Sequence, residues 1–245
     1  MGRVSEGGGE FVINGKSVLA VIPARGGSKR LSRKNILPLS GKPLVVWTIE
    51  AGLKSKFVDE VVVSSDDEEI LNISVKANAR AMIRPKELST DFATSLSVVN
   101  HVLDEMENNY DIIVLLQPTS PLRTNIDVDS ALELLSKNKA DGIISVCETD
   151  HNPLFANTLP VDGSMKNFIQ NNLKNTRTQD LPKYYRINGA IYIYKTRQLI
   201  DENTFFLKDN IFAYIMNKNE SVDIDDSFDY KFAEFLIENQ THNES

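Results

Sequence analysis

The sequence predicts a doubly wound α/β fold with a mainly parallel sheet. Short apolar runs rich in β-branched residues alternate with longer segments of helical periodicity, which is the pattern of βαβ units. Several runs are apolar throughout, as in strands that helices cover on both faces. With 245 residues, the chain is long enough to form one such domain with a sizeable core.

The expected strands are short, and most of them end in a polar or proline-containing loop. They span residues 18–23, 60–64, 112–116, 142–147, 189–194 and 212–216. The expected helices span residues 43–54, 67–79, 95–107, 125–137 and 228–238. Ligands of open α/β sheets bind at the carboxyl ends of the strands. A site is therefore expected in the loops after Pro23, after Leu116 and around Asp223.

We expect a single domain over residues 16–245. Residues 1–15 are rich in Gly and contain no apolar stretch of signal-peptide length, so they are expected to be a disordered extension or a tag remnant. Between residues 148 and 186, polar residues, Asn and Pro interrupt the alternation. This stretch is too long for a structureless loop inside a compact domain. Its apolar residues, such as Leu154 and Phe168, are expected to bury against a second copy in a two-fold homodimer.

Composition excludes several classes of protein. The net charge of -7 argues against a general binder of nucleic acid or of membrane surfaces. The single cysteine, Cys147, cannot form an intramolecular disulfide or a cysteine-rich metal site. No apolar run is long enough to span a bilayer. Together these features favour a cytoplasmic protein.

The loop after the first expected strand is strongly basic. Residues 24–35 read ARGGSKRLSRKN, and no Asp or Glu occurs between residues 11 and 48. Gly26 and Gly27 allow the backbone to turn sharply and to present its N–H groups, which suit a polyphosphate together with Lys and Arg. The loop has neither the Walker spacing nor G-x-G-x-x-G, which counts against a P-loop kinase and a dehydrogenase. We expect it to bind phosphate.

Six blocks occur in a characteristic order between residues 17 and 238. They read IPARGGSKRLSRKN, RPKEL from Arg84, LLQPTSPLR from Leu115, YRINGAIYIY from Tyr185, Phe205-Phe206 and Asp223-Ile224-Asp225. In these blocks the chain resembles the acylneuraminate cytidylyltransferases, the CMP-sialic acid synthetases. The resemblance implies a sheet of the nucleotide-diphospho-sugar transferase kind, with a small dimerisation element inserted where residues 148–186 lie.

The resemblance also implies a reaction and the residues that bind its nucleotide. CMP would pass from CTP to the anomeric hydroxyl of N-acylneuraminate or a related nonulosonic acid, and pyrophosphate would leave. The residues implied for CTP are Arg25, Ser28, Lys29, Lys34, Asn35, Arg84 and Ser95.

Residues in the later blocks are candidates for binding the sugar. They are Gln117, Thr119, Ser120, Arg186, Asn188, Tyr192, Phe205 and Phe206. Polar side chains after a buried strand can bind a polyhydroxylated ligand, and an Arg can bind its carboxylate through two hydrogen bonds. Taken without the resemblance, the sequence favours Arg186 as one partner of a strand-edge ion pair and the two phenylalanines as core residues.

Asp223 and Asp225 are the candidate metal ligands. If the segment is extended, both carboxylates lie on one face while Ile224 faces the core. Two such carboxylates can hold Mg²⁺ against phosphate oxygens, although an acidic start of the last helix is the alternative. The acidic run from Asp66 to Glu69 is attributed to the start of a helix and not to a metal site.

The proposed catalytic residues are Arg25, Lys29 and Lys34, which would meet charge developing on the phosphates, and Asp225. Cations supply most of the catalysis in such transfers. Asp225 could accept the hydroxyl proton, and a metal-bound hydroxide is the other candidate base. Two alternatives of another class stay open: a nucleotide-binding module without catalysis, and a phosphotransferase that yields a nucleoside diphosphate.

Two departures from the family pattern bear on the identity of the sugar. Family members specific for N-acetylneuraminate often carry a Lys shortly after a His-Pro-Leu-like segment, where this chain has Phe155, and an Arg where it has Thr178. Apolar surface at Phe155 would suit legionaminate or pseudaminate, which have a second acylamido group and a terminal methyl group. These acids are expected as substrates on a par with N-acetylneuraminate.

Overall fold

The computed structural model describes residues 13, 15–28, 30–90, 92–106, 109–170, 173, 177 and 180–241. Lys29, Thr178 and the extension up to residue 12 therefore lie outside the described residues. In the described part of the chain, the alternation of strands and helices expected from the sequence is present. The predicted α/β class is confirmed.

The main sheet has seven strands in the order β5-β4-β1-β6-β8-β7-β9. Its strands are β1 (Val18–Pro23), β4 (Glu60–Ser65), β5 (Arg80–Ile83), β6 (Ile112–Leu116), β7 (Gly142–Glu148), β8 (Tyr185–Lys195) and β9 (Ile211–Ile215). All pairs are parallel except those of β8, which runs antiparallel to both β6 and β7. The sheet is therefore mainly parallel, as predicted, with one reversed strand.

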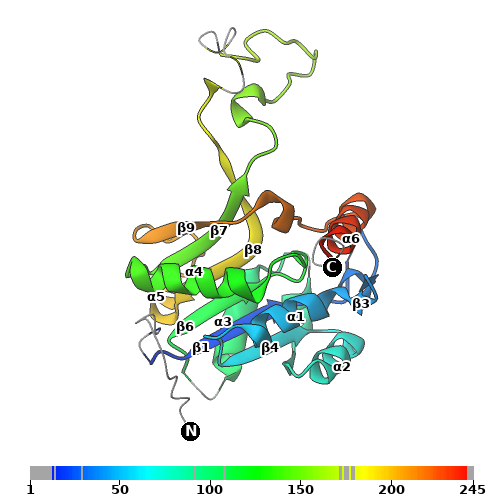
Figure 1. The fold of residues 1–245 in the computed structure, drawn as a ribbon, viewed down its shortest axis with the longest axis vertical. Helices are drawn as coiled ribbons and strands as arrows, with labels where there is room; N and C mark the ends of the chain where they lie inside the picture. The colour runs from blue at the N-terminus through cyan, green and yellow to red at the C-terminus, as the bar shows by residue number, and fades with distance from the viewer. Residues whose placement is uncertain are drawn as a thin grey trace.

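Helices cover both faces of the sheet (Figure 1). They are α1 (Leu44–Lys54), α2 (Glu68–Lys76), α3 (Ser95–Glu105), α4 (Asn125–Lys137), α5 (Thr196–Glu202) and α6 (Ser227–Thr241). Apolar residues of α1, α2 and α4 pack in one core, and those of α3 and α5 pack in a second core. None of the helices in the described ranges is long and apolar enough to cross a membrane.

The two cores follow from the period-2 geometry of the strands. In β1, Val18, Ala20 and Ile22 belong to the core under α1 and α4, whereas Leu19 and Val21 belong to the core under α3. Successive side chains of a strand point to opposite faces, so a strand that is apolar at every position must be covered twice. The continuous apolar run that predicted a buried strand is thus explained.

The order of the strands reverses between β1 and β6. From β1 the chain passes through α1 to β4 and on to β5, and then returns through α3 to β6 on the other side of β1. The connecting helices α1 and α3 lie on opposite faces, so the loops after β1 and β6 diverge. Such a switch point leaves a crevice at the carboxyl ends of the two strands.

A third apolar cluster fixes the last helix beside this crevice. Val222, Ile224, Ala233 and Ile237 pack with residues of α1 and of a small antiparallel hairpin, β2 (Pro38–Leu39) and β3 (Lys42–Pro43). The segment that precedes α6 is thereby held against the body of the protein. This packing brings Asp223 and Asp225 to the same edge as the basic loop.

The structure corrects several sequence-based boundaries. Strand β5 was not predicted, and β9 begins and ends one residue before the predicted strand. Helix α5 was also not predicted, and α2 ends at Lys76, before the expected residue 79. Strand β8 starts at Tyr185 and not at Gly189, because its first residues pair with the end of β7 beyond the main body.

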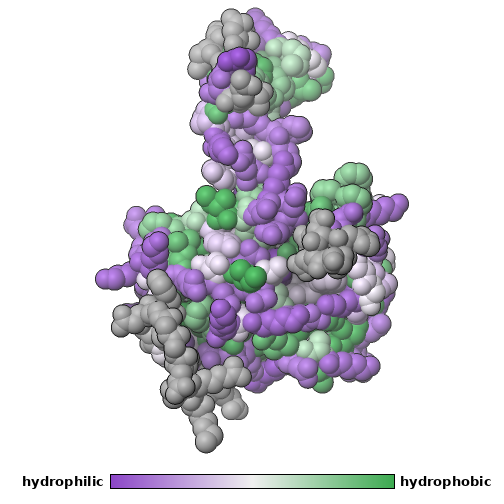
Figure 2. All heavy atoms as spheres, viewed as in Figure 1, coloured by the Kyte–Doolittle hydropathy of each residue, from purple (hydrophilic) through white to green (hydrophobic). Residues whose placement is uncertain are grey.

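The described residues between β7 and β8 (149–170, 173, 177 and 180–184) project from the body as an arm (Figure 1). Among the described residues of the arm the helical structure includes a short 3₁₀ turn, Pro153–Phe155. Apolar side chains are exposed on it, including Phe155, Leu159, Val161 and Met165. Figure 2 shows this apolar surface at the far end of the arm. The arm occupies the stretch in which the sequence predicted an insertion.

Candidate active site

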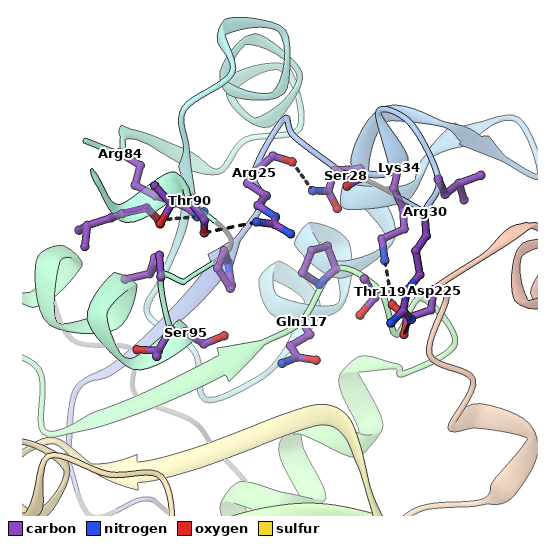
Figure 3. A pocket seen from close by; sticks show the side chains of 18 residues that line it. Arg25, Ser28, Arg30, Lys34, Arg84, Thr90, Ser95, Gln117, Thr119 and Asp225 are labelled. Atoms are coloured by element: carbon purple, nitrogen blue, oxygen red, sulfur yellow. Dashed lines mark hydrogen bonds and ion pairs between the residues drawn. The ribbon is translucent and has the colours of Figure 1, made fainter. Parts of the chain in front are cut away.

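A cavity of about 470 Å³ opens at the carboxyl ends of β1 and β6 (Figure 3). Its walls are the loop after β1, the turn between β5 and α3, the loop after β6 and the segment before α6. Many residues assigned from the sequence line it: Arg25, Ser28, Lys34, Asn35, Arg84, Ser95, Gln117, Thr119 and Asp225. Segments that are distant in sequence therefore meet where the strand order reverses.

The loop after β1 is folded tightly against the start of α2. The Gly26 N–H donates to Asp66 Oδ1 at 3.0 Å. A Cβ on Gly26 would stand 2.6 Å from Asp67 Oδ2, so a larger residue would force the two segments apart. At the other end of the loop, Asn35 is buried and its Nδ2 donates to the Arg25 carbonyl at 2.8 Å. These contacts fix the backbone that carries the basic side chains.

The acidic run after β4 serves the start of α2, as predicted. Asp67 is the N-cap residue, and its Oδ1 accepts from the N–H groups of Glu69 (2.9 Å) and Ile70 (3.2 Å). An N-cap carboxylate satisfies donors that the first turn leaves free and complements the helix dipole. Together with the bond from Gly26, these roles account for both aspartates without a metal ion.

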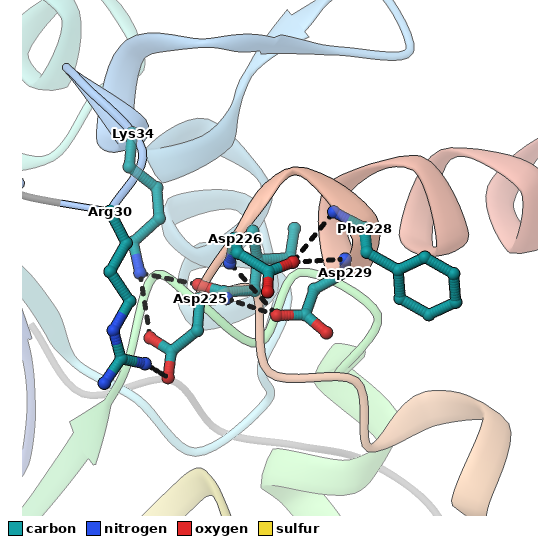
Figure 4. A network of polar contacts seen from close by, with 7 residues as sticks. Arg30, Lys34, Asp225, Asp226, Phe228 and Asp229 are labelled. Atoms are coloured by element: carbon teal, nitrogen blue, oxygen red, sulfur yellow. Dashed lines mark hydrogen bonds and ion pairs between the residues drawn. The ribbon is translucent and has the colours of Figure 1, made fainter.

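The cations of the basic loop point in two directions. Arg33 adopts a left-handed conformation, with φ of 53°, and pairs with Glu69 at 2.7 Å, away from the cavity. Arg30 and Lys34 instead reach across the cavity to Asp225, at 2.8 Å and 3.4 Å (Figure 4). Arg33 therefore binds to α2, whereas Arg30 and Lys34 line the cavity.

Arg84 forms part of the opposite wall and is buried. Its Nε donates to Ser64 Oγ at 3.2 Å and its Nη2 to the Ser64 carbonyl at 2.5 Å. Burial lowers the pKa of Arg84 to about 10, and the Asp66 carboxylate opposes this shift. The guanidinium therefore stays charged at neutral pH and adds positive potential to the cavity.

A bulge in β8 shapes the wall that faces Gln117. The register between β7 and β8 shifts between Ile144 and Val146. There the Ser145 hydroxyl donates to Asn188 Oδ1 at 2.6 Å and accepts from the Ile191 N–H at 2.8 Å. Bulges of this kind re-aim the backbone next to active sites.

Gly189 occupies the bulge with a positive φ of 78°. A Cβ at this position would stand 2.7 Å from Gln117 Oε1. Only glycine adopts this conformation at little cost and leaves the required space. The bulge therefore brings the β8 backbone against a side chain that lines the cavity.

Arg123, at the end of the LLQPTSPLR block, is buried under the same loop. Its Nη2 donates to Thr48 Oγ1 at 2.7 Å, and burial lowers its pKa to about 10. Asp127 opposes this pKa shift through its charge. The side chain of Arg123 is therefore part of the support of the loop and does not pair with a carboxylate at the surface.

In the segment before α6, Ile224 packs inward between the two aspartates, as the sequence analysis expected for an extended segment. The Ile224 N–H donates to the Thr119 carbonyl at 2.8 Å, and the Ile224 side chain is fully buried. Asp225 lines the cavity, whereas Asp223 lies deeper. Burial raises the pKa of Asp223, and the charge of Asp225 adds to this shift, while the Thr119 hydroxyl opposes it.

Asp223 Oδ1 is buried and has no hydrogen-bond partner among the described residues. A buried oxygen without a partner is costly in a native protein and calls for a ligand or a functional role. The helix start does not provide one, because the N-cap is Asp226, whose Oδ1 accepts from the Phe228 and Asp229 N–H groups (Figure 4). Within the described ranges, no three acidic, His or Cys residues form a metal-binding group.

Several residues predicted to bind the sugar do not line the cavity of the single chain. Asn188 is buried, and its amide bonds to Ser145 and Ser221, so it holds the bulge together. Arg186 lies at the base of the arm, where it donates to the Ser221 carbonyl at 3.3 Å. Ser120 is buried under the loop after β6.

The predicted aromatic residues form a group on the α3 and α5 side of the sheet. The rings of Tyr192 and Phe205 are 5.6 Å apart, and both are partly buried against the core. Phe206 is exposed. Burial raises the pKa of Tyr192, with a further contribution from Asp223, which places this ring near the buried carboxylate.

The turn between β5 and α3 contributes residues that the sequence analysis did not single out. Thr90, Ala93 and Thr94 line the cavity, and the Arg25 guanidinium donates to the Thr90 carbonyl at 3.3 Å. Thr94 is the N-cap of α3 and accepts from the Ser97 N–H. A Thr directly before a helical pattern is a recognised start signal and could have pointed to this turn.

Comparisons with known proteins agree with this arrangement. A family model described as cytidylyltransferase matches residues 19–243. A pseudaminic acid cytidylyltransferase of Campylobacter jejuni is 36% identical over 89% of this chain and 95% of the relative. An N-acylneuraminate cytidylyltransferase of Streptococcus agalactiae is 37% identical over 86% of this chain but only 51% of the longer relative. A CMP-N,N'-diacetyllegionaminic acid synthase of Legionella pneumophila is 34% identical over 90% of this chain and 96% of the relative.

The fold also matches a solved structure of low sequence identity. CMP:2-keto-3-deoxy-manno-octonic acid synthetase complexed with CTP superposes with a TM-score of 0.67, at 17% identity over 91% of this chain and 99% of that chain. At this identity the match bears on the fold alone, which is that of a nucleotidyltransferase. The match over residues 19–243 and the relatives above 30% identity decide the family. The chain belongs to the cytidylyltransferases.

Proposed function

We propose that this enzyme transfers CMP from CTP to the anomeric hydroxyl of a nonulosonic acid and releases pyrophosphate. The observation that carries the proposal is the cavity at the switch point, which Arg25, Lys34, Asn35 and Arg84 line together. Three of these side chains are cationic, as a triphosphate requires. The named activities of the relatives supply the sugar class.

In the proposed reaction the triphosphate lies along the loop after β1. The anomeric oxygen forms a bond to the α-phosphorus, the bond to the bridging oxygen of the β-phosphate breaks, and Asp225 accepts the hydroxyl proton. Arg25, Lys29 and Lys34 stabilise the charge that develops on the phosphate oxygens. Such groups act strongly because they are positioned before the charge appears.

Asp223 and Asp225 are proposed to hold Mg²⁺. Two carboxylates separated by one buried residue, one of them with an oxygen that lacks a partner, suit a hard cation. When bound, the ion would neutralise part of the phosphate charge.

We propose a two-fold homodimer in which the arm forms the interface. Phe155 is on the arm and is not among the residues that line the cavity of its own chain. The sequence departs from the family pattern at Phe155, which suggested a contact with the tail of the sugar. If Phe155 makes this contact, it does so in the cavity of a second copy. The sugar preference and the assembly are therefore linked proposals.

The proposal is tested by measuring pyrophosphate release with each of the four nucleoside triphosphates and a panel of sugar acids. Release with CTP and a nonulosonic acid is expected. CTP binding without release in the whole panel would indicate a non-catalytic module, and CDP as the product would indicate a phosphotransferase.

The individual sugar is resolved by kcat/KM for N-acetylneuraminate, legionaminate and pseudaminate. We expect legionaminate or pseudaminate to be used at least as well as N-acetylneuraminate, because Phe155 offers apolar surface. A preference of about a hundredfold or more for N-acetylneuraminate would mean that Phe155 and Thr178 do not read the tail.

A further inference from the structure

The carboxylate of Asp225 is already occupied by two cations of the basic loop. Arg30 Nη1 lies 2.8 Å from Asp225 Oδ2, and Lys34 Nζ lies 3.4 Å from Asp225 Oδ1 (Figure 4). Each carboxylate oxygen thus has one cationic partner. The contacts join the loop after β1 to the segment before α6 across the mouth of the cavity (Figure 3).

The two cations differ in how firmly they are held. Lys34 is mostly buried, and its Nζ also donates to the Ile224 carbonyl at 2.5 Å. The Arg30 side chain is 72% exposed, and Asp225 is its only polar partner among the described residues. Arg30 can therefore leave at little cost, because an exposed ion pair contributes little to stability, whereas Lys34 is fixed in place.

A divalent ion bound to Asp225 would compete with the guanidinium of Arg30 for the same carboxylate. Both are cations, and at the distance of a salt bridge their repulsion is strong. A triphosphate in the same cavity offers oxygen acceptors to a planar guanidinium, which binds phosphate through two hydrogen bonds. When metal and nucleotide bind, Arg30 therefore loses Asp225 as a partner and gains the phosphate oxygens.

We propose that Arg30 is a placeholder cation, which pairs with Asp225 in the free enzyme and moves to the β- and γ-phosphates when metal and CTP enter. This inference rests on the proposed function. Arg30 is then a positioning residue for metal in one state and a ligand of the leaving pyrophosphate in the other. Its exchange couples the binding of metal to the binding of nucleotide.

The first test uses Mn²⁺ alone, without nucleotide, and measures free Mn²⁺ by electron paramagnetic resonance. Arg30→Ala should bind Mn²⁺ about two- to fivefold more tightly than the parent, which is the range expected for an exposed ion pair. Arg30→Lys should lie close to the parent. Arg33→Ala is the matched control, because Arg33 is on the same loop but pairs with Glu69 away from the cavity, and it should leave Mn²⁺ affinity unchanged.

A double-mutant comparison assigns the effect to Asp225. Asp225→Asn should weaken Mn²⁺ binding, and adding Arg30→Ala to it should have no further effect. An unchanged or weaker Mn²⁺ affinity in the single Arg30→Ala variant would overturn the placeholder role. An equal gain from Arg30→Ala in the Asp225→Asn background would overturn it as well.

The second test titrates the protein with inorganic pyrophosphate by calorimetry in the presence of saturating Mn²⁺. Arg30→Ala should bind pyrophosphate about tenfold more weakly, since a hydrogen bond between charged groups is lost, and Arg33→Ala should match the parent. Unchanged pyrophosphate affinity would overturn the transfer to phosphate. Neither titration depends on turnover. A parent enzyme that releases no pyrophosphate from any nucleotide would therefore contradict the proposed function while the titrations still decide the role of Arg30.

Discussion

The body of the molecule and its arm differ in how far their apolar side chains are buried. In the body, every strand around the cavity is covered by helices, and polar groups such as Arg84 and Asn188 bond within the same chain. The arm instead exposes Val161 and Met165 and has little regular structure in its described residues. The cavity is therefore lined by residues of a single chain, whereas the arm exposes apolar surface that we propose as an interface.

The largest expected effect is on the body, at the two aspartates that we propose as metal ligands. Removal of divalent cations with EDTA should abolish turnover, and Asp223→Asn and Asp225→Asn should each cut kcat by about a thousandfold, because a neutral amide is a poor ligand for a hard cation. Pyrophosphate release at several Mg²⁺ concentrations measures this. Full activity of the parent in EDTA would remove metal from the mechanism.

Loss of a single cation should have the next largest effect. Arg25→Ala and Lys29→Ala should each lower kcat/KM by roughly a hundredfold, or about 3 kcal/mol of transition-state stabilisation, with the fold intact by circular dichroism. Arg33→Ala, on the same loop but directed to α2, is the control and should keep activity near that of the parent. If both variants retained full turnover, the basic loop would have no catalytic role.

On the arm we expect an effect on assembly. The double change Val161→Asp and Met165→Asp should weaken the dimer by tenfold or more, since charges replace apolar contact surface. Light scattering over a range of concentrations measures the mass. Ile126→Asp is a matched control, because Ile126 is an exposed apolar residue on α4 of the body. A parent protein that is monomeric at micromolar concentration would contradict the proposed role of the arm.

The smallest expected effect compares two glycines, one in each region. Gly189 and Gly163 both have a positive φ, 78° and 69°, but only at Gly189 would a Cβ meet a neighbour, Gln117 Oε1. Gly163→Ala should therefore cost only the conformational strain, about 1 kcal/mol. Gly189→Ala should lower the melting temperature further and raise KM for the sugar, because Gln117 must move. Equal thermal shifts and unchanged kinetics would show that the contact with Gln117 is unimportant.

Much of the body could be predicted because its strands are apolar and regular. The runs at residues 18–23 and 112–116 became β1 and β6 with unchanged bounds, since double burial leaves a continuous apolar signal. Strand β5 was missed because its four residues, RAMI, lie at the edge of the sheet, where half of the positions are exposed. The reversed direction of β8 could not be predicted from the pattern of apolar residues, because side chains alternate between the two faces of a sheet in parallel and in antiparallel strands alike.

The site was predictable by region but not by the direction of each side chain. Arg25 and Gln117 meet at one cavity because their loops follow the neighbouring strands β1 and β6, whereas Asp225 is brought there by the packing of α6. That Arg33 turns to α2 while Arg30 turns to Asp225 depends on a left-handed residue inside the loop. A dihedral of this kind in a non-glycine residue is set by the surrounding contacts, and the sequence pattern carries no signal for it.

The bulge in β8 has a mechanical consequence. Strand β8 is continuous from the base of the arm to the middle of the sheet, and its irregular point, Gly189, faces Gln117. A hydrogen-bonded strand is stiff along its axis but can pivot where its pairing is interrupted. We therefore expect a displacement of the arm to be taken up at Gly189, next to the wall of the cavity that Gln117 forms.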